Sequence, residues 1–127
     1  MENKKRILVV DDDSMIGEML KALLEFKGFE VTVTQKTEET EKIILLENID
    51  LVILDKLIAG VNGTDVCARL KKADTTAHIP ILMMSALHNA GKICKEAGAD
   101  DFIPKPFEME DLLAKIDKVL TKDAFVS

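Results

Sequence analysis

Short apolar runs alternate along the chain with segments of helical periodicity, and each run ends on polar residues. The four clearest runs are ILVV at 7–10, LVIL at 51–54, ILMM at 81–84 and FIP at 102–104. Apolar runs of this length, separated by helical patterns, are typical of buried parallel strands. The strands expected from them are 6–10, 50–54, 79–84 and 101–104. Alternation of valine with polar residues over 30–34 adds an edge strand.

Helical patterns fill the intervals between these strands. The expected helices are 14–27, one that begins near Thr37, one that follows Asn62-Gly63, 89–97, and a last one with an apolar stripe from Met109 to Leu120. We expect Thr37 to cap the second helix. Gly91 falls inside the fourth helix, where a glycine costs about 1 kcal/mol, so that helix should be weakly formed.

Strand and helix alternate five times, which predicts an α/β fold with a doubly wound parallel sheet between two layers of helices. A length of 127 residues suits one domain. We expect this domain to span residues 1–122, with 123–127 as a tail or the start of a linker.

The bulk composition excludes several classes of protein. A net charge of −6 argues against direct nucleic-acid binding, because phosphate contacts need a basic surface. No apolar run approaches the roughly 20 residues of a membrane span, and no signal-peptide pattern is present, so a cytoplasmic location is expected. Cys67 and Cys94 form no CxxC pair and should be reduced, packed thiols.

Polar residues at the strand ends supply the candidate chemistry. Asp11 and Asp12 follow the first run, Asp55 the third strand, Ser85 the fourth and Lys105 the fifth. In an open parallel sheet all carboxyl ends lie at one edge, where ligands bind, so these groups should converge. Crowded carboxylates favour a bound cation, and oxygen ligands alone suit Mg²⁺ or Mn²⁺. A lysine and a hydroxyl opposite them suit a phosphoryl group on an aspartate.

The chain resembles a response-regulator receiver domain of two-component systems along nearly its whole length. The motifs that carry the resemblance are VVDDD (9–13), LVILD (51–55), Asn62-Gly63, Ser85-Ala86 and AGADDFIPKPF (97–107). Each motif is weak alone, but their order and spacing together are specific. The resemblance implies a flavodoxin-like, five-stranded sheet in the order 2-1-3-4-5, with five helices.

The resemblance also implies roles for the clustered acids. Asp55 is similar to the phosphoacceptor of the family. Asp11 and Asp12 are similar to its metal-binding pair, and the carbonyl of Leu57 to a further ligand of the metal. Asp13, by contrast, is better explained as a helix cap or a solvated acid.

Further positions match the parts of the family that respond to the phosphoryl group. Ser85 resembles the hydroxyl that senses it, Lys105 the lysine that pairs with it, and Phe102 the switch aromatic that turns inward on activation. Ala86 resembles the small residue that leaves the pocket open. The chain departs from the family at Ile58-Ala59, where Met-Pro is usual, so the loop loses the stiffness of proline.

A receiver accepts a phosphoryl group from a sensor histidine kinase or a phosphotransfer protein and signals to an effector protein or domain. The resemblance therefore implies a signalling domain and not an enzyme, since it catalyses only its own phosphorylation and slow dephosphorylation. Phosphorylation should change the surface formed by the fourth helix, the fifth strand and the fifth helix. One option for output is that two phosphorylated copies form a dimer. We expect the unmodified protein to tolerate loss of Lys105, since the ammonium matters once the anion is present.

Three alternatives compete with this interpretation. A haloacid-dehalogenase-type phosphatase would use Asp11 as nucleophile, in an Asp11-x-Asp13 motif, but it needs an acidic motif after Lys105 and a cap region. A flavodoxin-type FMN carrier needs a phosphate-cradling loop after the first strand, where three aspartates stand instead. A degenerate receiver that only binds partners would lack one of the five site groups.

Overall fold

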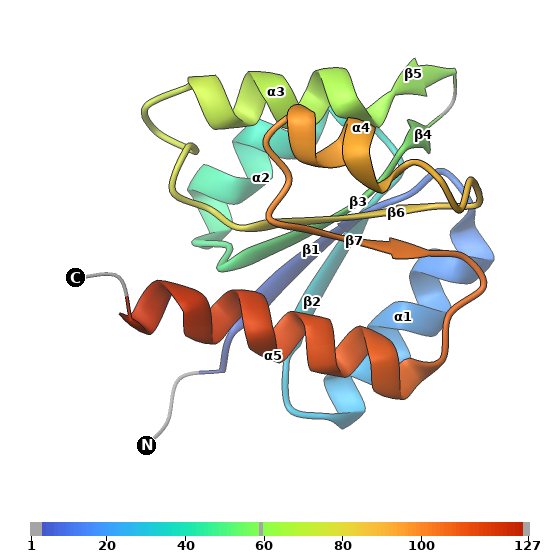
Figure 1. Ribbon diagram of the computed structural model, residues 1–127. Helices are drawn as coiled ribbons and strands as arrows, with labels where there is room; N and C mark the ends of the chain where they lie inside the picture. The colour runs from blue at the N-terminus through green and yellow to red at the C-terminus, as the bar shows by residue number, and fades with distance from the viewer. Residues whose placement is uncertain (1–3, 59, 126–127) are drawn as a thin grey trace.

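A single parallel sheet of five strands forms the centre of the molecule (Figure 1). The computed structural model describes residues 4–58 and 60–125. The strands of this sheet are β1 (Arg6–Val10), β2 (Glu30–Thr34), β3 (Leu51–Asp55), β6 (Ile81–Ser85) and β7 (Asp101–Pro104). They lie in the order β2-β1-β3-β6-β7, which confirms the predicted fold class and strand order.

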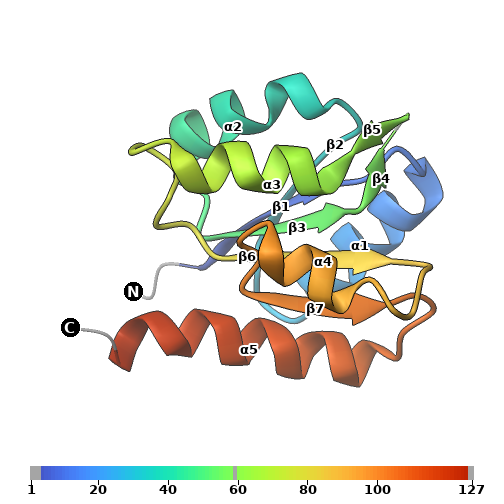
Figure 2. The ribbon, with the colours of Figure 1, turned by 45° about the horizontal axis from the view of Figure 1, so that its top comes forward.

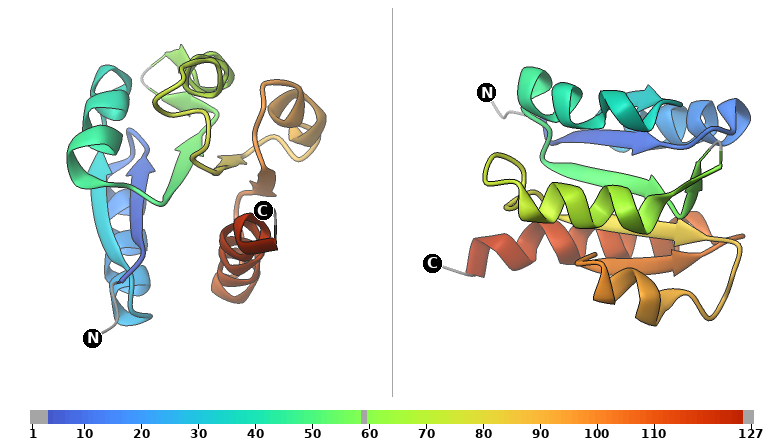
Figure 3. Two further views of the ribbon diagram at one scale, coloured as in Figure 1. Left: turned by 90° about the vertical axis from the view of Figure 1, so that its left-hand side faces the viewer. Right: turned by 90° about the horizontal axis from the view of Figure 1, so that it is seen from above.

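Helices cover both faces of the sheet and create three layers (Figures 2 and 3). Those on one face are α1 (Ser14–Phe26) and α5 (Met109–Phe125), and those on the other are α2 (Thr40–Glu47), α3 (Gly63–Lys72) and α4 (Gly91–Glu96). Leu51 and Ile53 of β3 pack toward α1 and α5, and Val52 and Leu54 pack toward the other three helices. Successive side chains of a strand point to opposite faces, so a strand covered on both sides is apolar throughout.

Side chains of aspartate and asparagine begin two of the helices. The Asp13 carboxylate accepts hydrogen bonds from the backbone N–H groups of Met15 and Ile16, at 3.0 and 3.3 Å, which confirms Asp13 as the cap of α1. Asn62 caps α3 by accepting from the N–H of Thr64 at 3.1 Å. These caps orient both helices directly after the sheet edge that carries the acids.

The entry to α2 differs from the prediction that Thr37 caps a helix. Thr37 instead begins the 3₁₀ turn η1 (Thr37–Glu39), and the α-helix starts at Thr40. The hydroxyl of Thr34 organises this turn, since it donates to Glu39 Oε1 at 2.9 Å and accepts from the Lys36 N–H at 3.2 Å. No side chain caps η1 or α2, so the Thr34 hydroxyl at the end of β2 orders the turn without acting as a helix cap.

Other boundaries also moved. Helix α4 begins at Gly91, so this glycine is its first residue and not an interior defect. The segment after β3 forms a small antiparallel hairpin of β4 (Leu57–Ile58) and β5 (Val61–Asn62), which was expected to be a loop. Helix α5 runs to Phe125, into the segment 123–127 that was expected to be a tail or the start of a linker. Of the Ile58-Ala59 departure, Ala59 lies outside the described residues, as do 126 and 127 of the expected tail.

Candidate functional site

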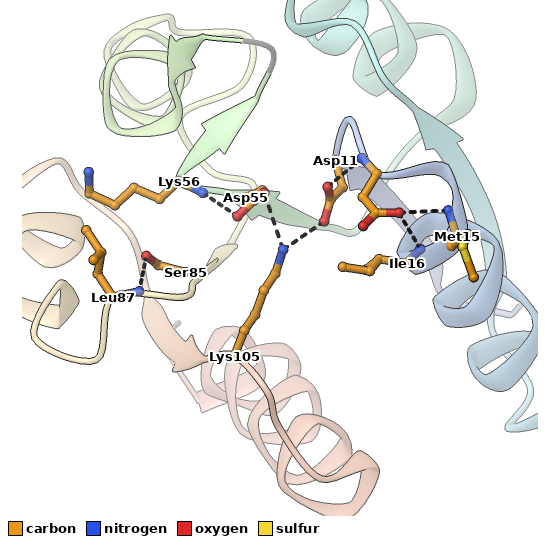
Figure 4. A network of polar contacts seen from close by, with 9 residues as sticks. Asp11, Met15, Ile16, Asp55, Lys56, Ser85, Leu87 and Lys105 are labelled. Atoms are coloured by element: carbon orange, nitrogen blue, oxygen red, sulfur yellow. Dashed lines mark hydrogen bonds and ion pairs between the residues drawn. The ribbon is translucent and has the colours of Figure 1, made fainter.

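The strand register brings the predicted site residues to one edge of the sheet. Asp55 is level with the last residue but one of β6, and Ser85 is level with Pro104 at the end of β7. Asp11 follows β1 directly, and Lys105 follows β7 directly. Figure 4 shows Asp11, Asp55, Ser85 and Lys105 around one point. The predicted convergence of four separate chain segments is therefore present in the fold.

The ammonium of Lys105 bridges two of the acids. Its Nζ lies 3.1 Å from Asp11 Oδ2 and 3.3 Å from Asp55 Oδ2. The Asp11 side chain is 1% exposed, so its charge has little access to water. Burial lowers the pKa of Lys105, but the carboxylates of Asp55 and Asp11 outweigh burial and raise it, which keeps the ammonium charged.

Asp55 stands in an environment that disfavours its charge. Burial raises its pKa, and the negative charge of Asp11 raises it further. Lys105 and the backbone N–H of Lys56, which donates to Asp55 Oδ1 at 2.9 Å, oppose this shift without cancelling it. A carboxylate in this position gains from any additional positive charge.

The acidic cluster has the composition of a metal site. Asp11, Asp12 and Asp55 each offer one carboxylate oxygen, and these oxygens lie within 4.8 Å of one another. Asp11 Oδ1 accepts the N–H of Asp13 at 2.9 Å, which fixes the carboxylate. Hard oxygen ligands suit a divalent cation such as Mg²⁺ or Mn²⁺, so the residues fit the expected ion. A role for the carbonyl of Leu57 stays a prediction.

The hydroxyl of Ser85 is almost buried, with the residue 4% exposed. Its oxygen accepts the backbone N–H of Leu87 at 3.0 Å. A hydroxyl that accepts one bond can still donate its proton, so Ser85 can bond an anion at Asp55. Ala86, between these two residues, lines a hollow of about 510 Å³ together with Lys105 and Phe107.

Phe102 on β7 is 9% exposed and belongs to the apolar cluster beneath α4. Ala90 and Cys94 are members of the same cluster. The ring of the predicted switch aromatic is therefore packed inward in this structure. Cys67 and Cys94 are both free and buried, as expected, and burial raises the pKa of the Cys67 thiol to about 11.

Two features of the site were not singled out from the sequence. A Cβ atom at Gly63 would collide with the carbonyl oxygen of Asp55, so no larger residue fits there. The Asn62-Gly63 motif pointed to this position but not to its contact. Lys56 was missed as well, and its place directly after Asp55 was the available signal.

Comparison with known proteins places the chain in a family. The family model of the response regulator receiver domain matches residues 7–117. The chain belongs to the response-regulator receiver domain family. It is therefore a phosphorelay signal receiver, and the phosphatase alternative is not supported. Asp11 is less accessible to a donor than Asp55, because its side chain is 1% exposed and that of Asp55 is 13% exposed.

Individual relatives show the same relationship. The phosphate regulon transcriptional regulatory protein PhoB of Pseudomonas aeruginosa is 36% identical over 120 residues, which cover 93% of this chain and 52% of the relative. Response regulator MprA of Mycolicibacterium vanbaalenii is 37% identical over 119 residues, 92% of this chain and 51% of the relative. The chain thus spans about half the length of the curated relatives it matches.

Solved structures match over a larger share of their own length. A putative response regulator from Chloroflexus aurantiacus superimposes with a TM-score of 0.88 at 33% identity, covering 94% of this chain and 99% of that one. The BeF3-activated N-terminal receiver domain of Klebsiella pneumoniae RstA has a TM-score of 0.83 at 29% identity, covering 91% of this chain and 98% of that one.

Within the described residues, none of the helices combines the length and the apolar character that a membrane span requires.

Proposed function

We propose that Asp55 accepts a phosphoryl group from a sensor histidine kinase or a phosphotransfer protein, with Mg²⁺ or Mn²⁺ bound by Asp11, Asp12 and Asp55. The observation that carries this proposal is the position of Lys105, whose ammonium lies within 3.3 Å of Asp55 at the edge that also holds the acidic cluster. Family membership supports it. The residue assignments rest on the geometry of this site and on the motif positions.

The transfer is a displacement at phosphorus. An ionised Asp55 oxygen attacks in line, and the new O–P bond forms as the bond to the donor breaks. The electron pair leaves with the donor, which is the imidazole nitrogen of phosphohistidine or the acetate of acetyl phosphate. Lys105 balances charge on the transferred oxygens, and a bound divalent cation supplies further electrostatic stabilisation.

The new anion should then reorganise the segments beside it. The Ser85 hydroxyl can donate to a phosphoryl oxygen, and Ser85 is bonded to the N–H of Leu87 in the loop that leads to α4. Movement of Ser85 therefore pulls on the start of α4, against which Phe102 packs. We infer that phosphorylation shifts the surface formed by α4, β7 and α5 and that this surface meets the effector.

The phosphodonor has an apolar surface to approach beside the site. Met15 and Met19 on α1 are 82% and 48% exposed, and Met19 lines the same hollow as Lys105. An amphipathic helix that carries a phosphohistidine fits such a surface, because exposed apolar side chains next to a reactive group mark a docking area. These exposed side chains support an approach of the donor on the α1 side, which leaves α4 for the output.

The remaining assignments follow from family membership. We infer a cytoplasmic signalling domain that turns over no external substrate beyond its phosphodonor. Its partners are a kinase or phosphotransfer protein and an effector protein or domain, and pairing of phosphorylated copies is an option for output. Direct nucleic-acid binding by this domain is not expected from the net charge of −6, and membrane binding is not expected because no apolar run is long enough for a span.

The test is to incubate the domain with acetyl phosphate and Mg²⁺, trap the acyl phosphate with borohydride and map the modified residue. We expect the label on Asp55, none in Asp55→Asn, and a sharp fall when the metal is chelated. A label on Asp11, or undiminished labelling of Asp55→Asn, contradicts the proposal. Asp74→Asn is a matched control, because Asp74 lies away from this edge, in the turn after α3.

A further inference from the structure

Lys56 places a second ammonium next to the phosphoacceptor. Its residue is partly buried, and among the residues whose side chains the structure describes, 4–58 and 60–121, its Nζ has no hydrogen-bond or ion-pair partner. The other ammonium of the site, on Lys105, has two. A partly buried charge without a partner is unfavourable and is therefore a candidate for a role in a second state of the protein.

The backbone of Lys56 is held firmly. Its N–H donates to Asp55 Oδ1 at 2.9 Å and to the carbonyl of Met84 at 2.8 Å. Its carbonyl accepts the N–H of Gly63. The Cα atom of Lys56 is thus fixed beside the reactive carboxylate, and only the flexible four-carbon stem is free to move.

The side chain of Lys56 extends away from the acids in this structure. Figure 4 shows it leading away from Asp55 on the side opposite Asp11, toward the part of the view that holds Ser85 and Leu87. Burial raises the pKa of the Cys94 thiol on α4, and the charge of Lys56 acts in the opposite direction. The ammonium therefore lies within electrostatic range of α4.

Phosphorylation changes the charge that Lys56 experiences. A phosphoryl group carries about −1.5 to −2 at neutral pH, whereas the Asp55 carboxylate that it replaces carries a single charge. Asp11 and Asp12 remain beside it, and Lys105 divides its charge between Asp11 and Asp55. The flexible ammonium of Lys56, whose Cα lies next to Asp55, is then attracted to the new anion over a short distance.

We propose that Lys56 is a second cation of the phosphoryl site, which rests on the α4 side in the unmodified protein and turns to the phosphoryl oxygens once Asp55 is modified. This inference rests on the proposed function of Asp55. The movement strengthens retention of the phosphoryl group. It also removes a positive charge from the start of the output surface, so one side chain links the site to α4.

The experiment measures the affinity of each variant for beryllofluoride, which is a mimic of the phosphoryl group, by NMR titration with Mg²⁺ present. Lys56→Met removes the charge at similar length, and Lys56→Arg keeps it. Lys95→Met removes an exposed ammonium from α4 and serves as the control. We expect Lys56→Met to bind beryllofluoride roughly 10-fold more weakly than the unsubstituted protein does at low salt. The affinities of Lys56→Arg and Lys95→Met should stay within about 2-fold of that of the unsubstituted protein.

The acyl phosphate should also decay faster in Lys56→Met than in the unsubstituted protein. On addition of beryllofluoride, the NMR peaks of α4 near Cys94 should shift less in Lys56→Met than in the unsubstituted protein. Unchanged affinity and lifetime in Lys56→Met, or failure of Lys56→Arg to restore them, overturns the inference. Lys56→Gln repeats the neutral case should Lys56→Met unfold. If acetyl phosphate does not label Asp55 in the unsubstituted protein, the proposed function fails too. If Asp55 is labelled normally but Lys56→Met keeps the affinity and the phosphate lifetime of the unsubstituted protein, only the role of Lys56 is removed.

Discussion

A Cβ atom at Gly91 would lie 3.3 Å from Cδ2 of Phe102, so the absence of a side chain at Gly91 makes room for the aromatic ring. Gly91 is the first residue of α4, and Phe102 is 9% exposed in the strand beside it. The glycine expected to weaken a helix interior instead permits close packing between α4 and β7. Its cost to the helix is small at a first-turn position, and its benefit is the inward place of Phe102.

The contact predicts that the effects of Gly91→Ala and Phe102→Leu are not additive. With Phe102 present, the helix-forming gain of alanine, at most about 1 kcal/mol, should be offset by displacement of the ring. In the Phe102→Leu background the same substitution should stabilise the protein. Urea unfolding of the four proteins should give a coupling of at least about 0.5 kcal/mol. Equal effects of Gly91→Ala in both backgrounds would show that the contact has no energetic weight.

Lys105→Ala should destabilise the metal-free, unmodified protein, contrary to the expectation from sequence. Removing the ammonium leaves the buried Asp11 carboxylate without its charged partner, which costs about 2 kcal/mol for a charged hydrogen bond. Urea unfolding in the presence of chelator measures this loss, and Mg²⁺ should recover much of it. Lys115→Ala is the control, because its partner Asp101 lies in a more exposed pair, worth at most about 1 kcal/mol. Equal losses in both variants would contradict the assignment.

Asp12→Ala and Asp13→Ala should show opposite patterns. Asp13 caps α1, so its loss should lower the unfolding free energy by about 1 kcal/mol and leave metal affinity nearly unchanged. Asp12 belongs to the acidic cluster, so its loss should weaken Mg²⁺ binding far more than it affects stability without metal. Calorimetric Mg²⁺ titration and urea unfolding of both variants separate the two roles. Equal losses of metal affinity would mean that the ligands are assigned wrongly.

Asp55→Asn should stabilise the metal-free protein at neutral pH. Burial and then the charge of Asp11 raise the Asp55 pKa in the fold, so the folded state binds this proton more tightly than the unfolded chain does. The contribution of Asp55 to stability is therefore present below the unfolded value of 3.8 and is lost as pH rises through the folded value. The advantage of Asp55→Asn should grow over that window and should shrink when Mg²⁺ is added. Thermal unfolding against pH tests this, and an advantage that decreases with rising pH has the wrong sign.

The sequence by itself determined the layers of the fold and the convergence of the candidate site residues. Continuous apolar runs such as LVIL can be satisfied only by strands covered on both faces, and parallel strands bring their carboxyl ends to one edge. Asp11, Asp55, Ser85 and Lys105 therefore had to meet once five alternating strands and helices were recognised. The cap at Asp13 was also predictable, because capping depends on neighbouring residues alone.

Only the tertiary structure decided which of these groups touch and what they do before phosphorylation. Lys105 and Asp11 are 94 residues apart, and their ion pair depends on strand register and on rotamers chosen by packing, which no local pattern encodes. The same holds for Gly91 under Phe102 and for the direction of Lys56. Thr37 shows the limit even at short range, because the hydroxyl of Thr34 at the end of the edge strand organised the turn that follows it. Local chemistry sets the periodicity and the Asp13 cap, whereas distant contacts set the partner of each charge.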